Sequence, residues 1–285
     1  MVNAATMQQR FAALDALYEK SYSTSGERAK AVDSAFLARF SDLLNPSKVS
    51  ALSNDDLRYA FSAANIAASA TSDASITRAM WQVLDALSKR KLATRSDRAN
   101  YWGQLVMERR MDEANAYSRA IPGNALPLQP VIKRAASAGS PAFLEATDAS
   151  KRVFISVPVD VTEGARVIVV GHPYCHFTRN AVAAIDQEPE LSAAIGKVAM
   201  FIMPPRRTLD STEAEDWNKA HPREAMHLVE RKTDWPMVDS WDTPTFYFLR
   251  NGRVVTKVTG WPREGHMSEL MAGLARIGVN VSGEP

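Results

Sequence analysis

The residues best suited to chemistry surround Cys175, the only cysteine in this chain of 285 residues. The apolar run at residues 166–170 predicts a buried strand, which leads through a short loop to Cys175 and then to a helix over residues 178–185. A thiol at the start of a helix faces unpaired backbone N–H groups and the positive end of the helix dipole, and both lower its pKa. We therefore expect Cys175 to be a nucleophile, activated by its position at the start of a helix.

A lone cysteine limits what this site can do. It excludes an intramolecular disulfide framework, a zinc cluster built from several thiolates and a self-contained two-cysteine redox couple. The chain has no second thiol that could resolve a mixed disulfide formed at Cys175. Thiol–disulfide exchange at Cys175 therefore needs an external thiol, from glutathione, from a partner protein or from a second copy of the chain.

The histidines form the second group of candidates. All five lie in the second half of the chain: His172, His176, His221, His227 and His266. His172 and His176 flank Cys175, so either imidazolium could stabilise the thiolate. The same three side chains make an N, S, N set that suits copper or zinc, but their closeness in sequence gives poor ligand geometry. We expect no metal and no other cofactor here, and we expect the other three histidines to be solvated or hydrogen-bonded loop residues.

A further motif lies at residues 242–255 and reads Asp-Thr-Pro-Thr-Phe-Tyr-Phe-Leu-Arg-Asn-Gly-Arg-Val-Val. Its aromatic run predicts a strand, and its Asn-Gly pair is typical of a hairpin turn into a second strand. Thr243 and Pro244 then stand at the point where the first strand begins.

The Cys175 segment and this motif together resemble the thioredoxin fold, over about residues 151–277. The resemblance implies a cis peptide bond before Pro244. It also implies that the backbone of Thr243 docks an extended substrate segment beside Cys175. Tyr174, Thr243 and Pro244 are therefore the expected substrate-binding residues.

Cys175 can be aligned with this superfamily in two registers. In the first, Cys175 is the nucleophile, Thr178 replaces the resolving cysteine as in monothiol relatives, and His176 and the helix start stabilise the thiolate. In the second, His172 replaces the nucleophile of the Cys-Pro-Tyr-Cys motif of glutaredoxins, and Cys175 is a remnant without catalytic function. We prefer the first, because residues 172–178 resemble the Asp-Pro-x-Cys-Pro-Tyr-Cys pattern of bacterial periplasmic disulfide oxidoreductases and isomerases.

The surrounding elements predict an α+β protein of two domains. Residues 1–122 read as an α-helical domain, in which Ser53 and Ser75 are candidate helix N-caps. Short connections favour a helical array. Residues 101–122 resemble one degenerate tetratricopeptide helix pair, and an irregular helical bundle is the alternative.

Beyond the helices, the prolines of residues 123–150 predict a linker. Residues 151–285 then form the expected thioredoxin-like domain, an α/β sandwich with a mixed sheet. Its expected strands lie at residues 153–157, 166–170, 198–203, 245–249 and 253–258, and its expected helices at residues 178–185, 211–220, 222–230 and 267–277. The two middle helices belong to an insertion between the third and fourth strands.

The charge and the hydropathy of the chain limit the classes of partner that we expect. The 34 Lys and Arg residues are interspersed with 32 Asp and Glu residues, for a net charge of +2, so nucleic acid is not an expected partner. No apolar run reaches the length of a membrane span. We expect a protein or glutathione thiol or disulfide as the partner, and the sequence leaves the oligomeric state open. The active-site pattern favours the periplasm, on the assumption of a leader removed ahead of Met1, and the cytoplasm is the alternative.

Three functions stay open on these observations. The first is thiol–disulfide exchange of monothiol type through Cys175. The second is a catalytically degenerate thioredoxin-like module that binds another protein, and the third is metal handling, with copper as the metal. A Cys175 pKa well below about 7 favours the enzyme, and a pKa near the free value of about 8.5 favours the binding module.

Overall fold

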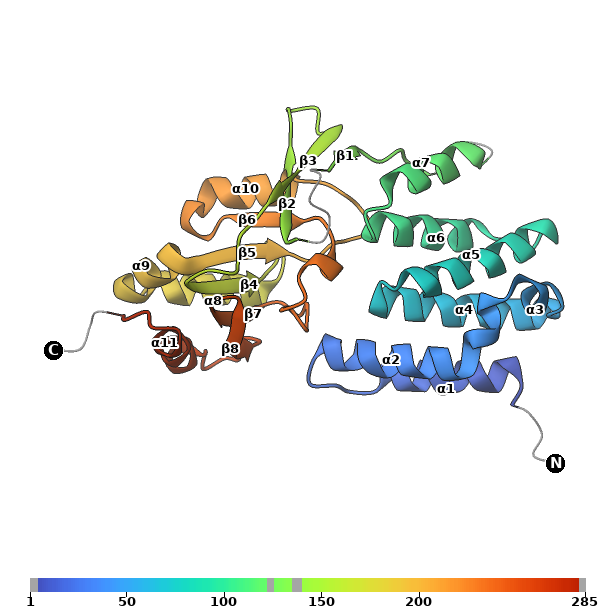
Figure 1. The fold of residues 1–285 in the computed structure, drawn as a ribbon, viewed down its shortest axis with the longest axis horizontal. Coiled ribbons are helices and arrows are strands. Elements are labelled where there is room, and N and C mark those ends of the chain that lie inside the picture. The colour runs from blue at the N-terminus through green and yellow to red at the C-terminus, as the bar shows by residue number, and fades with distance from the viewer. Residues whose placement is uncertain (1–4, 122–125, 135–139, 282–285) are drawn as a thin grey trace. The chain divides into compact units, whose positions relative to one another are not determined.

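A computed structural model describes residues 5–121, 126–134 and 140–281 of the protein. The chain divides into two compact units, Met1–Gln129 and Pro130–Pro285 (Figure 1). The described part of the first unit is helical, and the second unit holds the β-sheet. The expected α+β organisation, with helices first, is therefore confirmed. The domain boundary expected after residue 122 lies outside the described residues.

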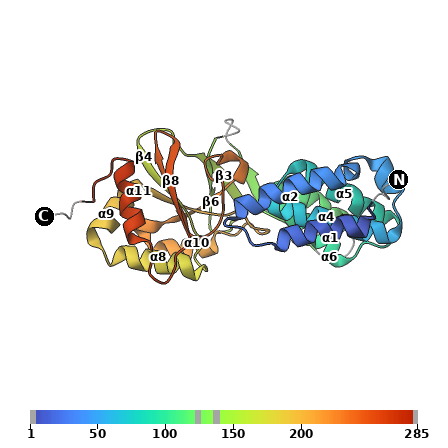
Figure 2. The same cartoon turned by 90° about the horizontal axis from the view of Figure 1, so that it is seen from below.

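The first unit consists, in its described part, of consecutive helices joined by short connections. They are α1 (Met7–Glu19), α2 (Ser25–Phe40), the 3-10 turn Ser41–Leu44, α3 (Pro46–Ser50), α4 (Asn54–Thr71), α5 (Ala74–Lys89), α6 (Arg95–Met107) and α7 (Met111–Ala120). Helix α4 is central and contacts α1, α2, α5 and α6 (Figures 1 and 2). Its buried face is built largely from alanines, whose small side chains let the neighbouring helices approach closely.

Short polar side chains set where these helices begin. Ser53 caps α4 as expected, and its side chain accepts a hydrogen bond from the amide of Asp56. The expectation for α5 is wrong: Asp73 is its N-cap, not Ser75. The Asp73 carboxylate accepts from the amides of Ser75 and Ile76, and an ionised acceptor binds such amides more strongly than a hydroxyl does.

The second unit consists of a β-sheet and the helices that connect its strands or follow them. Its strands are β1 (Val131–Lys133), β2 (Ala142–Ala146), β3 (Val153–Pro158), β4 (Ala165–Val170), β5 (Ala199–Met203), β6 (Met226–Val229), β7 (Thr245–Arg250) and β8 (Arg253–Thr259). Its helices are α8 (His176–Asp186), α9 (Pro189–Val198), α10 (Thr212–Ala220) and α11 (Met267–Arg276), with 3-10 turns at Pro222–Glu224 and Lys232–Asp234.

All eight strands form one mixed sheet in the order β1-β3-β2-β6-β5-β4-β7-β8. Strand β4 pairs in parallel with β5 and antiparallel with β7, and β7 forms a hairpin with β8. Val167, Ile168, Val169 and Val170 of β4 are completely buried. An apolar central strand, covered on both faces, therefore leads directly to the Cys175 segment.

Side chains of β7 alternate between the two faces of the sheet. Tyr247 and Leu249 join a core cluster with Trp235 and Ile168. Helix α11 covers the opposite face, where a Cβ added to Gly273 would lie 2.6 Å from the ring of Phe248. Helix α11 can pack this closely on β7 only because residue 273 has no side chain.

Three segments of the second unit differ from the sequence expectation. Residues 123–150 are not simply a linker, because they contain β1 and β2, which pair with β3. Residues 226–229 form β6 rather than a helix, since three of the four side chains are buried in a strand that pairs with β5 and β2. Helix α9 was not expected, and Val198 ends it instead of opening β5.

Within the described ranges, no helix is both long and apolar enough to cross a membrane.

Candidate functional site

A tight turn carries the chain from β4 to Cys175. The carbonyl oxygen of His172 accepts a hydrogen bond from the Cys175 amide at 3.0 Å, which closes a four-residue turn with Pro173 in its second position. The Nδ1 atom of the His172 side chain accepts from the Tyr174 amide at 3.2 Å. The His-Pro-Tyr-Cys sequence thus fixes its own loop and presents Cys175 to α8.

Cys175 is the N-cap residue of α8, with an extended backbone at φ −78° and ψ 112°. This is the position from which Ser, Thr or Asp side chains usually accept hydrogen bonds from the first amides of a helix. The half-buried thiolate would accept there from the amides of Phe177 and Thr178. Burial opposes ionisation, but these amides and the side chains of Thr243 and Thr178 together hold the pKa of Cys175 below its ordinary value.

The second motif meets Cys175 from the start of β7. The Thr243–Pro244 peptide bond is cis, as expected. The Cys175 thiol donates a hydrogen bond to the carbonyl oxygen of Thr243 at 3.3 Å. Two residues that lie 68 positions apart in the sequence therefore form one site, with Pro244 buried beneath it.

Thr178 is a buried residue of the site. It is the third residue of α8 and is 1% exposed. Its Cγ2 atom packs 3.1 Å from where a Cβ of Gly171 would lie, and its hydroxyl accepts from the His172 amide at 3.5 Å. Thr178 is thus a packed residue beneath Cys175, and its hydroxyl is within reach of the sulfur.

The two flanking histidines have different surroundings. Nε2 of His172 lies 3.2 Å from a carboxylate oxygen of Glu213 and 3.1 Å from Nη1 of Arg206. Burial and the Arg206 charge lower the pKa of His172, against the opposing effect of Glu213, so this ring holds the loop in its neutral form. His176 is exposed and lies against Phe177, with 3.8 Å between ring centroids and the two rings tilted by 38°.

The contact of His172 with Glu213 and Arg206 was not foreseen. Arg206 and Glu213 belong to the insertion between β5 and β7, and Glu213 lies in α10. Arg206 and Glu213 form an ion pair of 3.1 Å. Their charges look like ordinary surface charges in the sequence, so only the fold brings them to the Cys175 loop.

The rim of the site is aromatic. Tyr174 is 68% exposed and Phe177 is 44% exposed on either side of Cys175, which leaves the sulfur half-buried rather than covered. Trp235 and Trp261, which lie close to the motif of residues 242–255 in the sequence, are 0% and 7% exposed and belong to the core. Exposed apolar side chains next to a reactive atom are suited to contact with another molecule.

The remaining histidines lie outside this site. His227, in β6, stacks on Phe143 with 4.1 Å between ring centroids, and His266 lies 3.1 Å from Glu269. Within the described ranges, the group of side chains that could hold a metal ion does not include His172, Cys175 or His176. It consists of Asp186, His221 and Glu224.

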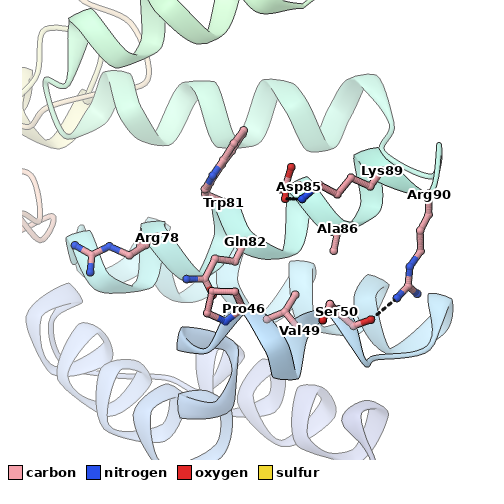
Figure 3. A pocket seen from close by; sticks show the side chains of 10 residues that line it. All are labelled: Pro46, Val49, Ser50, Arg78, Trp81, Gln82, Asp85, Ala86, Lys89 and Arg90. Carbon is pink, nitrogen blue, oxygen red and sulfur yellow. Dashed lines mark hydrogen bonds and ion pairs between the residues drawn. The ribbon is translucent and has the colours of Figure 1, made fainter.

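The helical unit has a groove of its own between α3 and α5. It has a volume of about 440 Å³ and is lined by Pro46, Val49, Ser50, Arg78, Trp81, Gln82, Asp85, Ala86, Lys89 and Arg90 (Figure 3). Asp85 pairs with Lys89 at 2.6 Å, and Arg90 donates to the carbonyl oxygen of Ser50 at 2.8 Å. Asp85 and Lys89 thus neutralise each other and Arg90 is bound to the backbone, and we assign the groove no chemistry.

Comparison of the chain with protein-family models, with curated proteins and with solved structures found no match. The function is therefore argued from the geometry of the site.

Proposed function

We propose that the second unit is a thioredoxin-like domain and that the protein takes part in thiol–disulfide exchange through Cys175, as a monothiol. The observation that carries this proposal is the position of Cys175: an N-cap thiol of α8, 3.3 Å from the carbonyl oxygen of Thr243, the residue before cis Pro244. The strand order β5-β4-β7-β8, with a cysteine after the central parallel strand, also supports it. This geometry favours the register in which Cys175 is the nucleophile.

The reaction would have two steps. After the Cys175 proton passes to solvent, the thiolate attacks one sulfur of a disulfide R–S–S–R′. A new S–S bond joins Cys175 to R–S, and R′–S⁻ leaves and is protonated by water. Thr178 offers no second thiol, so an external thiolate, from glutathione or a protein, must attack the mixed disulfide to release Cys175 as thiolate.

The residues around the sulfur have separate roles in this proposal. The amides at the start of α8 and the hydroxyl of Thr178 stabilise the thiolate as attacking and as leaving group. Thr243 offers main-chain groups to an extended substrate segment, with Tyr174 at the rim. His176 lies on the exposed surface against Phe177. We therefore assign the stabilisation of the thiolate to the amides at the start of α8 rather than to the His176 imidazole.

The test is covalent trapping on the full chain. Incubation with glutathione disulfide at neutral pH should give one adduct per chain in intact mass spectra, formed faster than the mixed disulfide of free cysteine with glutathione under the same conditions. A reductant should remove the adduct, and Cys175→Ser should not form it. If no adduct forms, Cys175 is a remnant and the protein is better described as a binding module, with which Thr178 in place of a second thiol is equally compatible.

The compartment belongs to the same proposal. The active-site sequence at residues 172–178 resembles periplasmic oxidoreductases, and we propose the periplasm on that ground alone. Cell fractionation with compartment markers tests it, and recovery of the native protein with cytoplasmic markers would contradict it.

A further inference from the structure

A second cluster of chemically capable side chains lies in the second unit. Asp186, His221 and Glu224 each place one ligand atom within 4.8 Å of the other two. They come from three elements: Asp186 ends α8, His221 follows α10 as its C-cap, and Glu224 ends the 3-10 turn Pro222–Glu224. None of the three has a role in the chemistry proposed for Cys175.

The state of Glu224 points to an occupant for this cluster. Glu224 is 3% exposed, and its Oε1 atom is buried without a hydrogen bond among the residues that the structure describes. Burying a carboxylate oxygen without a partner is costly, and the Asp186 carboxylate adds repulsion. A bound cation would satisfy the buried oxygen and neutralise both charges.

The helix ends favour a cation as well. Asp186 and His221 stand at the C-terminal ends of α8 and α10, where the helix dipole carries partial negative charge. Two such ends meet at this cluster with two carboxylates. The local potential therefore opposes an anion and attracts a positive ion.

Neighbouring residues hold the ligands in place. The indole of Trp217 donates to the carbonyl oxygen of Glu224 at 2.8 Å, and the same ring stacks on His221 with 4.0 Å between centroids. The Ser192 hydroxyl donates to Asp186 at 3.4 Å. Such outer contacts orient ligands in metal sites, and here one tryptophan fixes two of them.

We propose that Asp186, His221 and Glu224 bind one divalent transition-metal cation of the Zn²⁺ type, in a site that ties α8 to the insertion. One imidazole and two carboxylates are a donor set that Zn²⁺ accepts, with water as a fourth ligand. Bonds of about 2.0–2.2 Å bring tetrahedral ligands to about 3.4 Å from one another. The present spacing of up to 4.8 Å has to shorten when the ion binds, and Asp186 can move toward the other two ligands because its side chain is exposed.

Titration with Zn²⁺ alone tests the proposal. The full chain should carry Cys175→Ser, because a free thiol also binds zinc. Calorimetry should give about one equivalent of Zn²⁺ per chain, and Zn²⁺ should raise the melting temperature. Asp186→Asn, His221→Gln and Glu224→Gln should each weaken binding by about tenfold or more. Asp186→Asn alters an exposed side chain and so leaves the fold intact.

His266→Gln is the matched control, because His266 also lies beside a carboxylate, that of Glu269, at 3.1 Å. It should leave the zinc affinity unchanged. The proposal is overturned if excess Zn²⁺ gives neither heat nor a rise in melting temperature. It is also overturned if His266→Gln abolishes binding while His221→Gln does not.

Discussion

The Cys175 sulfur lies 3.3 Å from the carbonyl oxygen of Thr243, because Cys175 follows β4 and Thr243 precedes β7 at the same end of these antiparallel neighbours, where Val170 pairs with Thr245. The thiol form donates to this oxygen, whereas the thiolate would turn to the amides of α8. The site can thus hold the sulfur in either protonation state, and the N-cap position favours the thiolate.

Thr178→Val should raise the pKa of Cys175. The substitution keeps the buried volume but removes the hydroxyl that lowers the thiol pKa. A hydrogen bond to a charged group contributes about 1.5–3 kcal/mol, so losing most of it should slow alkylation by iodoacetamide at neutral pH about tenfold. Alkylation rates measured across pH give the pKa directly. Thr256→Val in β8 is the control, and equal pKa values in wild type and Thr178→Val would refute the role of the hydroxyl.

Thr178→Cys should create a two-cysteine site. Residue 178 is buried one turn of α8 from Cys175, and a cysteine is smaller than the threonine that already fits against Gly171. We expect an internal disulfide in an oxidised glutathione buffer, seen as the loss of two hydrogens in intact mass, and turnover of small disulfides that wild type lacks. Two free thiols under these conditions would argue for the other register.

Gly273→Ala should destabilise the second unit. The added Cβ would lie 2.6 Å from the Phe248 ring, and such overpacking costs about 1–3 kcal/mol. Alanine's better helix propensity returns at most about 1 kcal/mol, so a net loss is expected in denaturant unfolding. Gly196→Ala in α9 is the matched control. Nothing lies within 4 Å of its added Cβ, so it should stabilise by up to about 1 kcal/mol, and a loss as large as that of Gly273→Ala would contradict the packing argument.

His227 should make stability depend on pH. Burial lowers its pKa, against the opposing charge of Glu145, so the folded chain binds the proton less readily than the unfolded chain. Stability from this group is complete above the unfolded pKa of about 6.5 and is lost as pH falls through the folded pKa. His227→Phe keeps a ring on Phe143 and cannot ionise. Urea unfolding of both proteins at several pH values should show wild type losing more stability in acid, and parallel curves would speak against this role.

Local sequence determined much of the helical unit and of the Cys175 loop. Apolar spacing and capping side chains act over a few residues, so the start of α4 at Ser53 and the β7–β8 hairpin were predicted nearly as they occur. The turn that ends at Cys175 likewise depends on His172, Pro173 and their neighbours alone. The same local rules misplaced the N-cap of α5, because Asp73 and Ser75 compete for the same helix start and differ only in acceptor strength.

Tertiary structure decided what local rules could not. Residues 226–229 form a strand because they pair with β2 on one side and with β5 on the other. These pairing partners are distant in the chain, so a four-residue segment read by itself does not reveal them. The approach of Thr243 to Cys175, of Glu213 to His172 and of Glu224 to Asp186 depends on the same sheet. Side chains supply the chemistry, but their distances are set by strand order, which the sequence encodes only through the packing of the whole second unit.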